Sequence, residues 1–237
     1  MTDKSAIFWD HDLCLRASAF AARAHLDQRM LQGTHYLLHV SSVAMETAGA
    51  VARSSGRLEG DLAIPCAWLH DTVEDTDTTL DDIREAFGAR IASGVSALTK
   101  NGDLPKDEAM RDSLRRLLDQ PPSVRVVKVA DRIVNLQSPP DSWSRAKRTR
   151  YADEGALILD TLRGTDPWLE SRLEGTIATY RARHIDPSCP LLIVPTHHQP
   201  PEHARSGATR APTNGAIAAT TLLIRPWVSP VLSRTYS

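Results

Sequence analysis

Apolar residues recur at intervals of three and four positions along residues 15–184, the spacing that places them on one face of an α-helix. Short connections separate these stretches, and no alternating β pattern or hairpin turn interrupts them. The pattern therefore predicts an all-α fold. We expect its helices within residues 15–29, 36–56, 61–71, 78–88, 89–100, 105–120, 122–138, 141–164 and 167–184.

Two of these segments stand out. Residues 61–71 are apolar on almost every side, which predicts a central, buried helix. Residues 122–138 are rich in valine, as strands often are, but their apolar positions recur at three and four, which favours a buried helix. Its polar residues Lys128, Asp131 and Asn135 follow one another at i, i+3 and i+7, so they form a single stripe.

Several helix ends carry their usual signals. Thr78 or Thr79 is a candidate N-cap, and Gly88 follows the same helix as its stop. Pro105 has the residue type typical of a first helical position.

The chain changes character near Asp186. Eight of its fifteen prolines lie in the last 52 residues, among Gly, Ser, Thr and Ala. We therefore expect a helical domain over residues 1–185 and a Pro-rich tail over residues 186–237, either loosely ordered or packed on the domain as a strap.

Composition excludes few functions. The formal net charge of −1 gives no reason to expect nucleic acid or a membrane surface as a partner. Three cysteines are too few and too scattered for a disulfide framework, and Cys66 lies among apolar residues, as a small core residue would. The N-terminus has no signal-peptide pattern and no apolar run is long enough to span a membrane, so we expect a cytoplasmic protein.

The stretch AWLHDTVEDT, residues 67–76, carries the first candidate chemistry. On one continuous helix His70 would lie over Glu74, and Asp71 over Asp75. An imidazole and three carboxylates at the end of a buried helix repel one another unless a positive charge is present, and a divalent cation would supply it. A solvated acidic turn is the alternative.

Further ligands could come from two other helices. His39 lies between Leu38 and Val40, and Asp131 belongs to the polar stripe on residues 122–138. Taken alone, His39 fits a hydrogen-bonded core histidine and Asp131 a solvated face. Lys128, on an apolar helix, needs a partner, for which Glu74 and Asp75 are candidates.

The order of these residues resembles the H…HD…D pattern of HD phosphohydrolases. More narrowly, it resembles the hydrolase domain of RelA/SpoT-type enzymes and the stand-alone small alarmone hydrolases, over about residues 15–165. The segments that carry the resemblance are AFAARAH (19–25), GTHYLLH (33–39), HDTVED (70–75) and KVADRIVN (128–135). It implies an HD-domain helical bundle with a central metal site.

The resemblance also implies roles. The enzyme would remove the 3′-pyrophosphate of (p)ppGpp, a small-molecule nucleotide, to give GDP or GTP and pyrophosphate. Glu74 and Asp75 would orient or deprotonate the attacking water. The implied ligands of one Mn²⁺ ion are His39, His70, Asp71 and Asp131. The implied substrate-binding residues are Asn135, Lys106, Arg111, Lys147 and Tyr151, with Arg29 as a further candidate.

The match departs from the family in front of His39. Met30 and Leu31 occupy the positions of an Arg-Lys pair that helps to hold the purine in the long enzymes, Arg29 lies one place early, and His35 replaces a proline. Guanine recognition is therefore the open point. Two alternatives follow: an HD phosphohydrolase that acts on another nucleotide or phosphoester, or a metal-binding regulatory module without turnover. The chain has no room for a synthetase domain, so a stand-alone hydrolase is expected.

Overall fold

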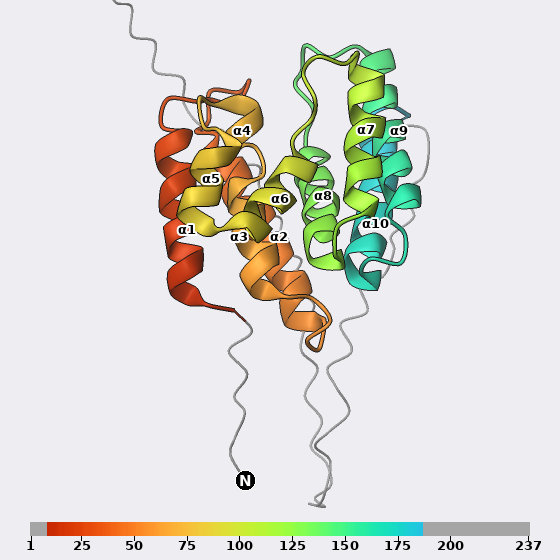
Figure 1. The fold of residues 1–237 in the computed structure, drawn as a ribbon. Coiled ribbons are helices and arrows are strands. Elements are labelled where there is room, and N and C mark those ends of the chain that lie inside the picture. The colour runs from red at the N-terminus through yellow and green to blue at the C-terminus, as the bar shows by residue number, and fades with distance from the viewer. Residues whose placement is uncertain (1–8, 187–237) are drawn as a thin grey trace, which may run out of the picture. The chain divides into compact units, whose positions relative to one another are not determined.

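The computed structural model describes residues 9–186, which form ten helices and no extended strand (Figure 1). The predicted all-α class is confirmed. The expected Pro-rich tail, apart from Asp186, lies outside the described residues. The helices are α1 His11–Ala24, α2 Leu37–Arg53, α3 Gly60–Leu69, α4 Thr72–Asp75, α5 Leu80–Phe87, α6 Ala89–Leu98, α7 Lys106–Leu118, α8 Pro122–Asn135, α9 Arg145–Thr161 and α10 Pro167–His184.

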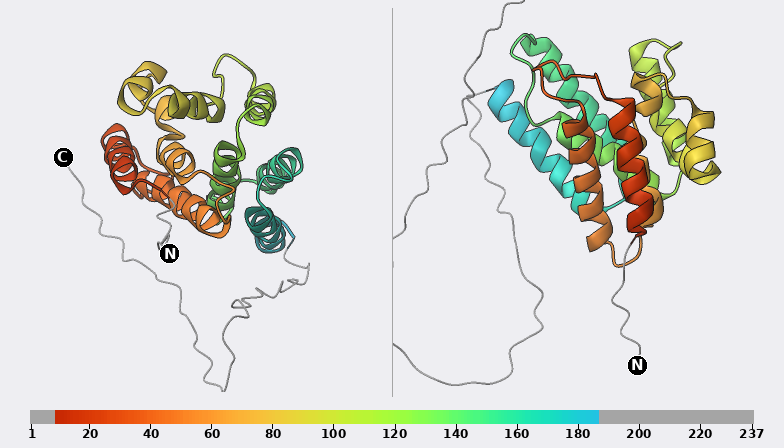
Figure 2. Two further views of the ribbon diagram at one scale, coloured as in Figure 1. Left: turned by 60° about the horizontal axis from the view of Figure 1, so that its bottom comes forward. Right: turned by 90° about the vertical axis from the view of Figure 1, so that its left-hand side faces the viewer.

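Three helices form the centre of the bundle. α2, α3 and α8 pack against one another, α1 packs on α3 at one side, and α9 and α10 pack at the other side near α8 (Figures 1 and 2). All residues of α3 except Asp61 and Trp68 are buried, as expected for a helix without a polar face. None of the described helices has the length and apolar character that a membrane span needs.

The valine-rich segment is helical, as predicted. α8 begins at Pro122, a favourable first helical residue, and buries ten of its fourteen residues. Among the buried ones are Lys128 and Asp131, which are only 5% exposed. The polar stripe therefore faces the interior of the bundle, where it must find partners.

The helix ends follow the expected signals closely. Thr79 is the N-cap of α5 and forms a capping box with Asp82. Gly88 follows with φ of 87°, a conformation that glycine adopts without strain. Pro105 is the N-cap of α7, one place before its predicted position.

Close helix contacts depend on two glycines. A Cβ at Gly94 of α6 would lie 2.7 Å from Sγ of Cys66 in α3, and Cys66 is fully buried, as predicted. A Cβ at Gly49 of α2 would lie 3.0 Å from the ring of Trp168 in α10. Arg53 and Arg172 lie over the Trp168 ring at 4.6 and 5.0 Å from its centroid, which adds cation–π attraction between α2 and α10.

Candidate metal centre

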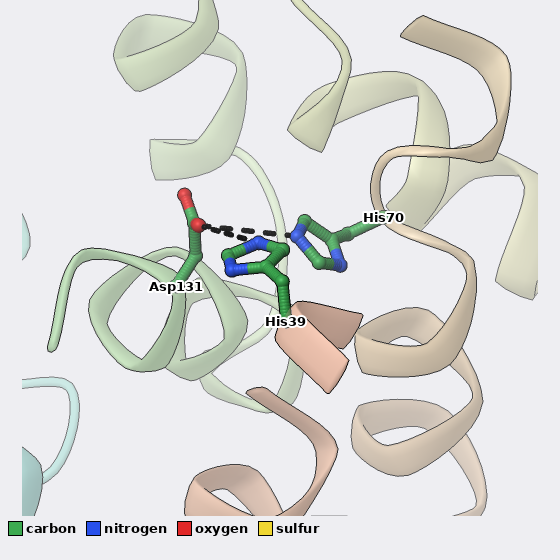
Figure 3. A group of neighbouring side chains, drawn as sticks. All are labelled: His39, His70 and Asp131. Carbon is green, nitrogen blue, oxygen red and sulfur yellow. Dashed lines mark ion pairs between the residues drawn. The ribbon is translucent and has the colours of Figure 1, made fainter. Parts of the chain in front are cut away.

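Three buried side chains from the three central helices meet at one point. His39 comes from α2, His70 from the residue after α3, and Asp131 from α8 (Figure 3). One ligand atom from each lies within 4.8 Å of the others. Oδ1 of Asp131 is 3.4 Å from Nε2 of His39 and 3.9 Å from Nε2 of His70. Imidazole nitrogens and a carboxylate oxygen that converge in this way can hold a divalent metal ion.

Asp71 lies beside this cluster. Its Oδ2 is 2.9 Å from Nε2 of His70 and 3.5 Å from Nε2 of His39. The sequence placed the two residues on one helix that continues to Asp75, and that expectation is wrong. α3 ends at Leu69, and Asp71 has φ of −103° and ψ of −3° before α4 begins at Thr72. This turn brings the carboxylate of Asp71 back toward the ring of its neighbour.

The environment of His70 fixes which nitrogen faces the cluster. Its Nδ1 donates a hydrogen bond of 2.8 Å to the carbonyl of Ala67. Its Nε2 is buried and directed into the cluster, where Oδ2 of Asp71 lies 2.9 Å away. Burial lowers the pKa of this ring, but the charges of Asp71 and Asp131 outweigh burial and raise the pKa. A histidine that is oriented through one nitrogen and directs the other toward carboxylates has the usual arrangement of a metal ligand. The donor set thus fits a divalent ion.

Asp131 is held as an anion. Lys128 donates to its Oδ2 at 3.2 Å, and the Asn135 side-chain amide donates to its Oδ1. Burial would raise the pKa of Asp131, but Lys128 and the two histidines outweigh burial and hold the pKa well below its ordinary value. The predicted stripe is one hydrogen-bonded unit. The suggestion that Lys128 pairs with Glu74 or Asp75 is wrong, because the nearer carboxylate is one helical turn along α8.

His39 carries a proton in the metal-free protein. Its burial lowers the pKa of the imidazole, but hydrogen bonds and charges from Asp131 and Asp71 raise this pKa to about 10. A metal ion that binds Nε2 must therefore displace a proton.

Tyr36 links the cluster to the loop before α2. Its hydroxyl donates to Oδ2 of Asp71 at 2.6 Å, and its ring lies between the rings of His25 and His39, at 5.0 and 5.2 Å. Burial and the charge of Asp71 raise the pKa of Tyr36 well above its ordinary value, so the hydroxyl stays a donor. Sequence reasoning assigned Tyr36 no role, although it lies in the segment that ends at His39.

The acidic pair lies on α4, exposed at the surface. Glu74 accepts hydrogen bonds from Nζ and from the backbone N of Lys100, at 2.7 and 3.0 Å. Asp75 accepts from the side-chain amide of Gln28 at 3.0 Å. Sequence reasoning missed Lys100 and Gln28, since no local spacing relates them to α4.

Two of the expected substrate residues share one aromatic contact. Nζ of Lys147 lies 4.2 Å from the ring centroid of Trp143, which in turn meets the ring of Tyr151 at 4.9 Å. Arg132 covers Tyr151 from α8 at 4.5 Å. Burial raises the pKa of Tyr151 to about 12. The charge of Arg132 lowers this pKa, and the charges of Asp131 and Glu154 raise it, so burial determines the direction.

The other expected substrate residues are not joined to the cluster. Lys106 and Arg111 are exposed on α7, and Arg29 is exposed in the loop before α2, where it forms an isolated bridge with His35. Within residues 9–186, no hydrogen bond or ion pair connects these three side chains to the metal cluster. Their roles stay predictions.

A cavity of about 630 Å³ opens beside Asp75, and its lining includes neither Glu74 nor a residue of the metal cluster. Gln28 and Asp75 lie on its wall, together with Arg23, Asp27 and Asp77. Its volume is in the range of small-molecule sites in proteins.

The sequence of this chain is similar to an HD domain and to several pyrophosphohydrolases. The pattern of the HD domain matches residues 17–166, a range that contains every residue of the metal cluster. The human guanosine-3′,5′-bis(diphosphate) 3′-pyrophosphohydrolase MESH1 is 34% identical over 166 residues, which cover 68% of this chain and 90% of that protein. The Aquifex aeolicus guanosine-3′,5′-bis(diphosphate) 3′-pyrophosphohydrolase is 33% identical over 126 residues, 52% of this chain but 17% of that longer protein.

A solved structure agrees in fold. It is described as a metazoan ortholog of SpoT that hydrolyzes ppGpp and plays a role in starvation responses. Its similarity to this chain has a TM-score of 0.63 at 26% sequence identity, and it covers 74% of this chain and 98% of that one.

Proposed function

The chain belongs to the HD domain family, and from this premise we propose that it is a metal-dependent hydrolase that removes the 3′-pyrophosphate of (p)ppGpp, releasing GDP or GTP and pyrophosphate. The observation that carries the proposal is the buried cluster of His39, His70 and Asp131, with Nε2 of His70 directed into it and held from the other side by the carbonyl of Ala67. The relatives that bear this activity in their names, and that the chain covers almost entirely, support the choice of substrate.

The proposed ligands of the ion are His39, His70, Asp71 and Asp131. Two imidazoles and two carboxylates suit Mn²⁺, an ion that accepts both nitrogen and oxygen donors. When bound, such an ion supplies Lewis-acid activation of a water molecule. The chain supplies the orientation: Ala67 fixes His70, Lys128 and Asn135 fix Asp131, and Tyr36 fixes Asp71.

Glu74 and Asp75 are the proposed acceptors of the water proton. The water oxygen forms a bond to the 3′ phosphorus, the bond from this phosphorus to ribose O3′ breaks, and O3′ takes up a proton as pyrophosphate leaves. Both residues lie on α4 and are exposed, and Asp75 lines the cavity described above.

Cationic and aromatic groups are the proposed contacts of the substrate. Lys147 and Tyr151 on α9, and Lys106 and Arg111 on α7, would bind phosphate oxygens, while Asn135 would contact the ribose or phosphate region. Arg29 is the remaining basic candidate near the base. The cytoplasmic location inferred from the sequence stays a prediction.

One observation favours a second candidate, the hydrolysis of another nucleotide or phosphoester. Leu31 is 80% exposed at a position where the resemblance implies a cation over the purine. An exposed leucine supplies neither the charge nor the hydrogen bonds that guanine recognition uses.

A panel of nucleotides and simple phosphoesters tests both candidate activities. Purified protein with Mn²⁺ should release pyrophosphate from ppGpp, and the release should stop after metal removal and return with added Mn²⁺. Turnover of other nucleotides or simple phosphoesters without turnover of ppGpp would contradict the first proposal and support the second.

A further inference from the structure

A chain of hydrogen bonds runs from a buried histidine to the acidic pair. Nδ1 of His25 lies 2.6 Å from Oε1 of Gln28, and Nε2 of Gln28 donates to Oδ2 of Asp75 at 3.0 Å. His25 follows α1 and is 1% exposed, whereas Asp75 is exposed on α4. The chain thus joins the protein interior to a carboxylate at the surface.

The donors and acceptors in these two hydrogen bonds follow from the kinds of group that make them. A carboxylate only accepts, so Gln28 must direct its NH₂ group toward Asp75 and its carbonyl oxygen toward His25. That oxygen also only accepts, so Nδ1 of His25 must carry a hydrogen. Nε2 of His25 is buried without a hydrogen-bond partner among the described residues, so Nδ1 makes the hydrogen bond that orients the ring.

The backbone of Gln28 is fixed on both sides. Its N–H donates to the carbonyl of His25 at 3.1 Å, and its carbonyl accepts from the N–H of Tyr36 at 3.0 Å. The ring of His25 lies 5.0 Å from the ring of Tyr36. These contacts fix where the Gln28 side chain starts, and its hydrogen bond with His25 orients the amide toward Asp75.

We propose that Gln28 and His25 are positioning residues that direct the carboxylate of Asp75 at the water it deprotonates. Gln28 binds Oδ2, whereas Oδ1 of Asp75 has no partner within residues 9–186 and is left to accept a hydrogen bond from water. This inference rests on the proposed hydrolase function and adds two residues to it. Neither residue touches the metal cluster.

The two acids are therefore held in different ways. The ammonium group and the backbone N–H of Lys100 bind both oxygens of Glu74. Asp75 receives one hydrogen bond from a neutral amide, which orients the carboxylate without a counter-charge. The loop from His25 to Tyr36 also holds Asp71 through the Tyr36 hydroxyl, so one loop aligns a proposed ligand and a proposed proton acceptor.

Four variants test the proposal with the Mn²⁺-loaded protein. Gln28→Met removes the amide, and Gln28→Glu keeps an acceptor for His25 but sets a second carboxylate against Asp75. Both should lower kcat about tenfold to a hundredfold, with KM for ppGpp and Mn²⁺ affinity unchanged within about twofold, as in loss of an oriented catalytic group. His25→Leu should lower kcat by about as much as Gln28→Met does. His25→Asn, whose amide nitrogen can replace Nδ1, should retain most of kcat.

The double variant His25→Leu/Gln28→Met should be no slower than Gln28→Met alone, since both act through one carboxylate. Unchanged kcat in Gln28→Met, equal losses in His25→Asn and His25→Leu, or multiplicative losses in the double variant would overturn the proposal. A thermal unfolding curve of each variant separates these results from misfolding.

A readout without turnover keeps the inference apart from the proposed function. In the NMR spectrum the side-chain amide protons of Gln28 should exchange slowly with solvent, and Asp75→Ala should make them exchange faster and shift. If wild-type protein does not cleave ppGpp, the hydrolase proposal fails on its own, while unshifted Gln28 amide signals in Asp75→Ala would refute the positioning role.

Discussion

Nε2 of His70 lies 3.9 Å from Oδ1 of Asp131, and both side chains are buried between α3 and α8. Hydrogen bonds orient both side chains: the carbonyl of Ala67 accepts from Nδ1 of His70, Lys128 donates to Oδ2 of Asp131, and Asn135 donates to its Oδ1. The two helices therefore present a nitrogen and a negatively charged oxygen to one point before any ion is bound.

Asp131→Asn should remove most of the metal affinity. The substitution keeps the shape but deletes the anion, so we expect Mn²⁺ affinity to fall by more than about a hundredfold and turnover to be lost. It also leaves Lys128 buried without its counter-charge, which should lower the free energy of unfolding by about 3 kcal/mol. Titration calorimetry and denaturant unfolding measure the two effects. Lys128→Met is the matched control and should weaken Mn²⁺ binding less than Asp131→Asn does.

Metal binding should release a proton. Asp131 and Asp71 raise the pKa of His39 to about 10 in the metal-free protein, in spite of its burial. From pH 6.5 toward that pKa, Mn²⁺ affinity should therefore rise by up to about tenfold per pH unit. Calorimetry at pH 7 in two buffers of different ionisation enthalpy counts the protons, and a count of zero would contradict the protonated state of His39.

The raised pKa of His39 should make the metal-free protein less stable as the pH rises, whereas metal affinity increases with pH. The folded pKa of His39, about 10, lies above the ordinary value of 6.5. Its contribution to stability is thus complete below pH 6.5 and is lost as the pH rises toward about 10. Unfolding curves of the metal-free protein across this range serve as the check.

Glu74→Ala should abolish turnover while Mn²⁺ still binds. Glu74 lies outside the cluster and accepts hydrogen bonds from Lys100, so its removal takes away a proposed proton acceptor and no proposed ligand. Kinetics with ppGpp and a Mn²⁺ titration of the same sample measure both. Loss of the ion together with activity would mean that Glu74 is a ligand and that its assigned role is wrong.

Replacement of Met30 and Leu31 by Arg and Lys should improve recognition of ppGpp. The two cations would restore contacts over the purine, and at about 0.5–2 kcal/mol such contacts should lower KM for ppGpp about threefold to tenfold at nearly constant kcat. KM for an analogue of ppGpp with a pyrimidine base, measured with the same variant, serves as the comparison. Equal changes for both nucleotides would indicate general charge attraction and not recognition of the base.

Gly94→Ala should destabilise the fold where α6 approaches α3. The new methyl group would lie 2.7 Å from Sγ of the buried Cys66, which has no open space to move into, so we expect a loss of about 1–3 kcal/mol. Gly175→Ala in α10 is the matched control. Outside the backbone of its own helix and its chain neighbours, no atom lies within 4 Å of the new Cβ, and the substitution should stabilise by up to about 1 kcal/mol. Equal effects at both positions would contradict the packing argument.

Sequence periodicity predicted the helices because each one depends on its own buried face. The apolar surface of α3 and the spacing of α8 are local properties, and so is the stripe of Lys128, Asp131 and Asn135. The break at His70 and Asp71 was missed because the i, i+4 pattern continues through it although the backbone leaves the helix.

Contacts between distant segments could not be predicted in this way. Gln28 and Asp75 are 47 positions apart, and Lys100 and Glu74 are 26 apart, so no periodic pattern relates them. The pairing of Tyr36 with Asp71 is of the same kind. Such partners follow from how the helices and loops are packed, not from the spacing of residues along any one of them.

The turn between α3 and α4 separates a rigid part of residues 70–75 from a more mobile part. His70 and Asp71 directly follow α3, of whose ten residues eight are buried, and such buried helices belong to the most stable part of a fold. Glu74 and Asp75 lie on a helix of four residues, tethered by Lys100 and Gln28, that can fray locally. Substitutions at Lys100 and Gln28 would therefore change the placement of the proposed proton acceptors while the helices that carry the proposed metal ligands stay unchanged.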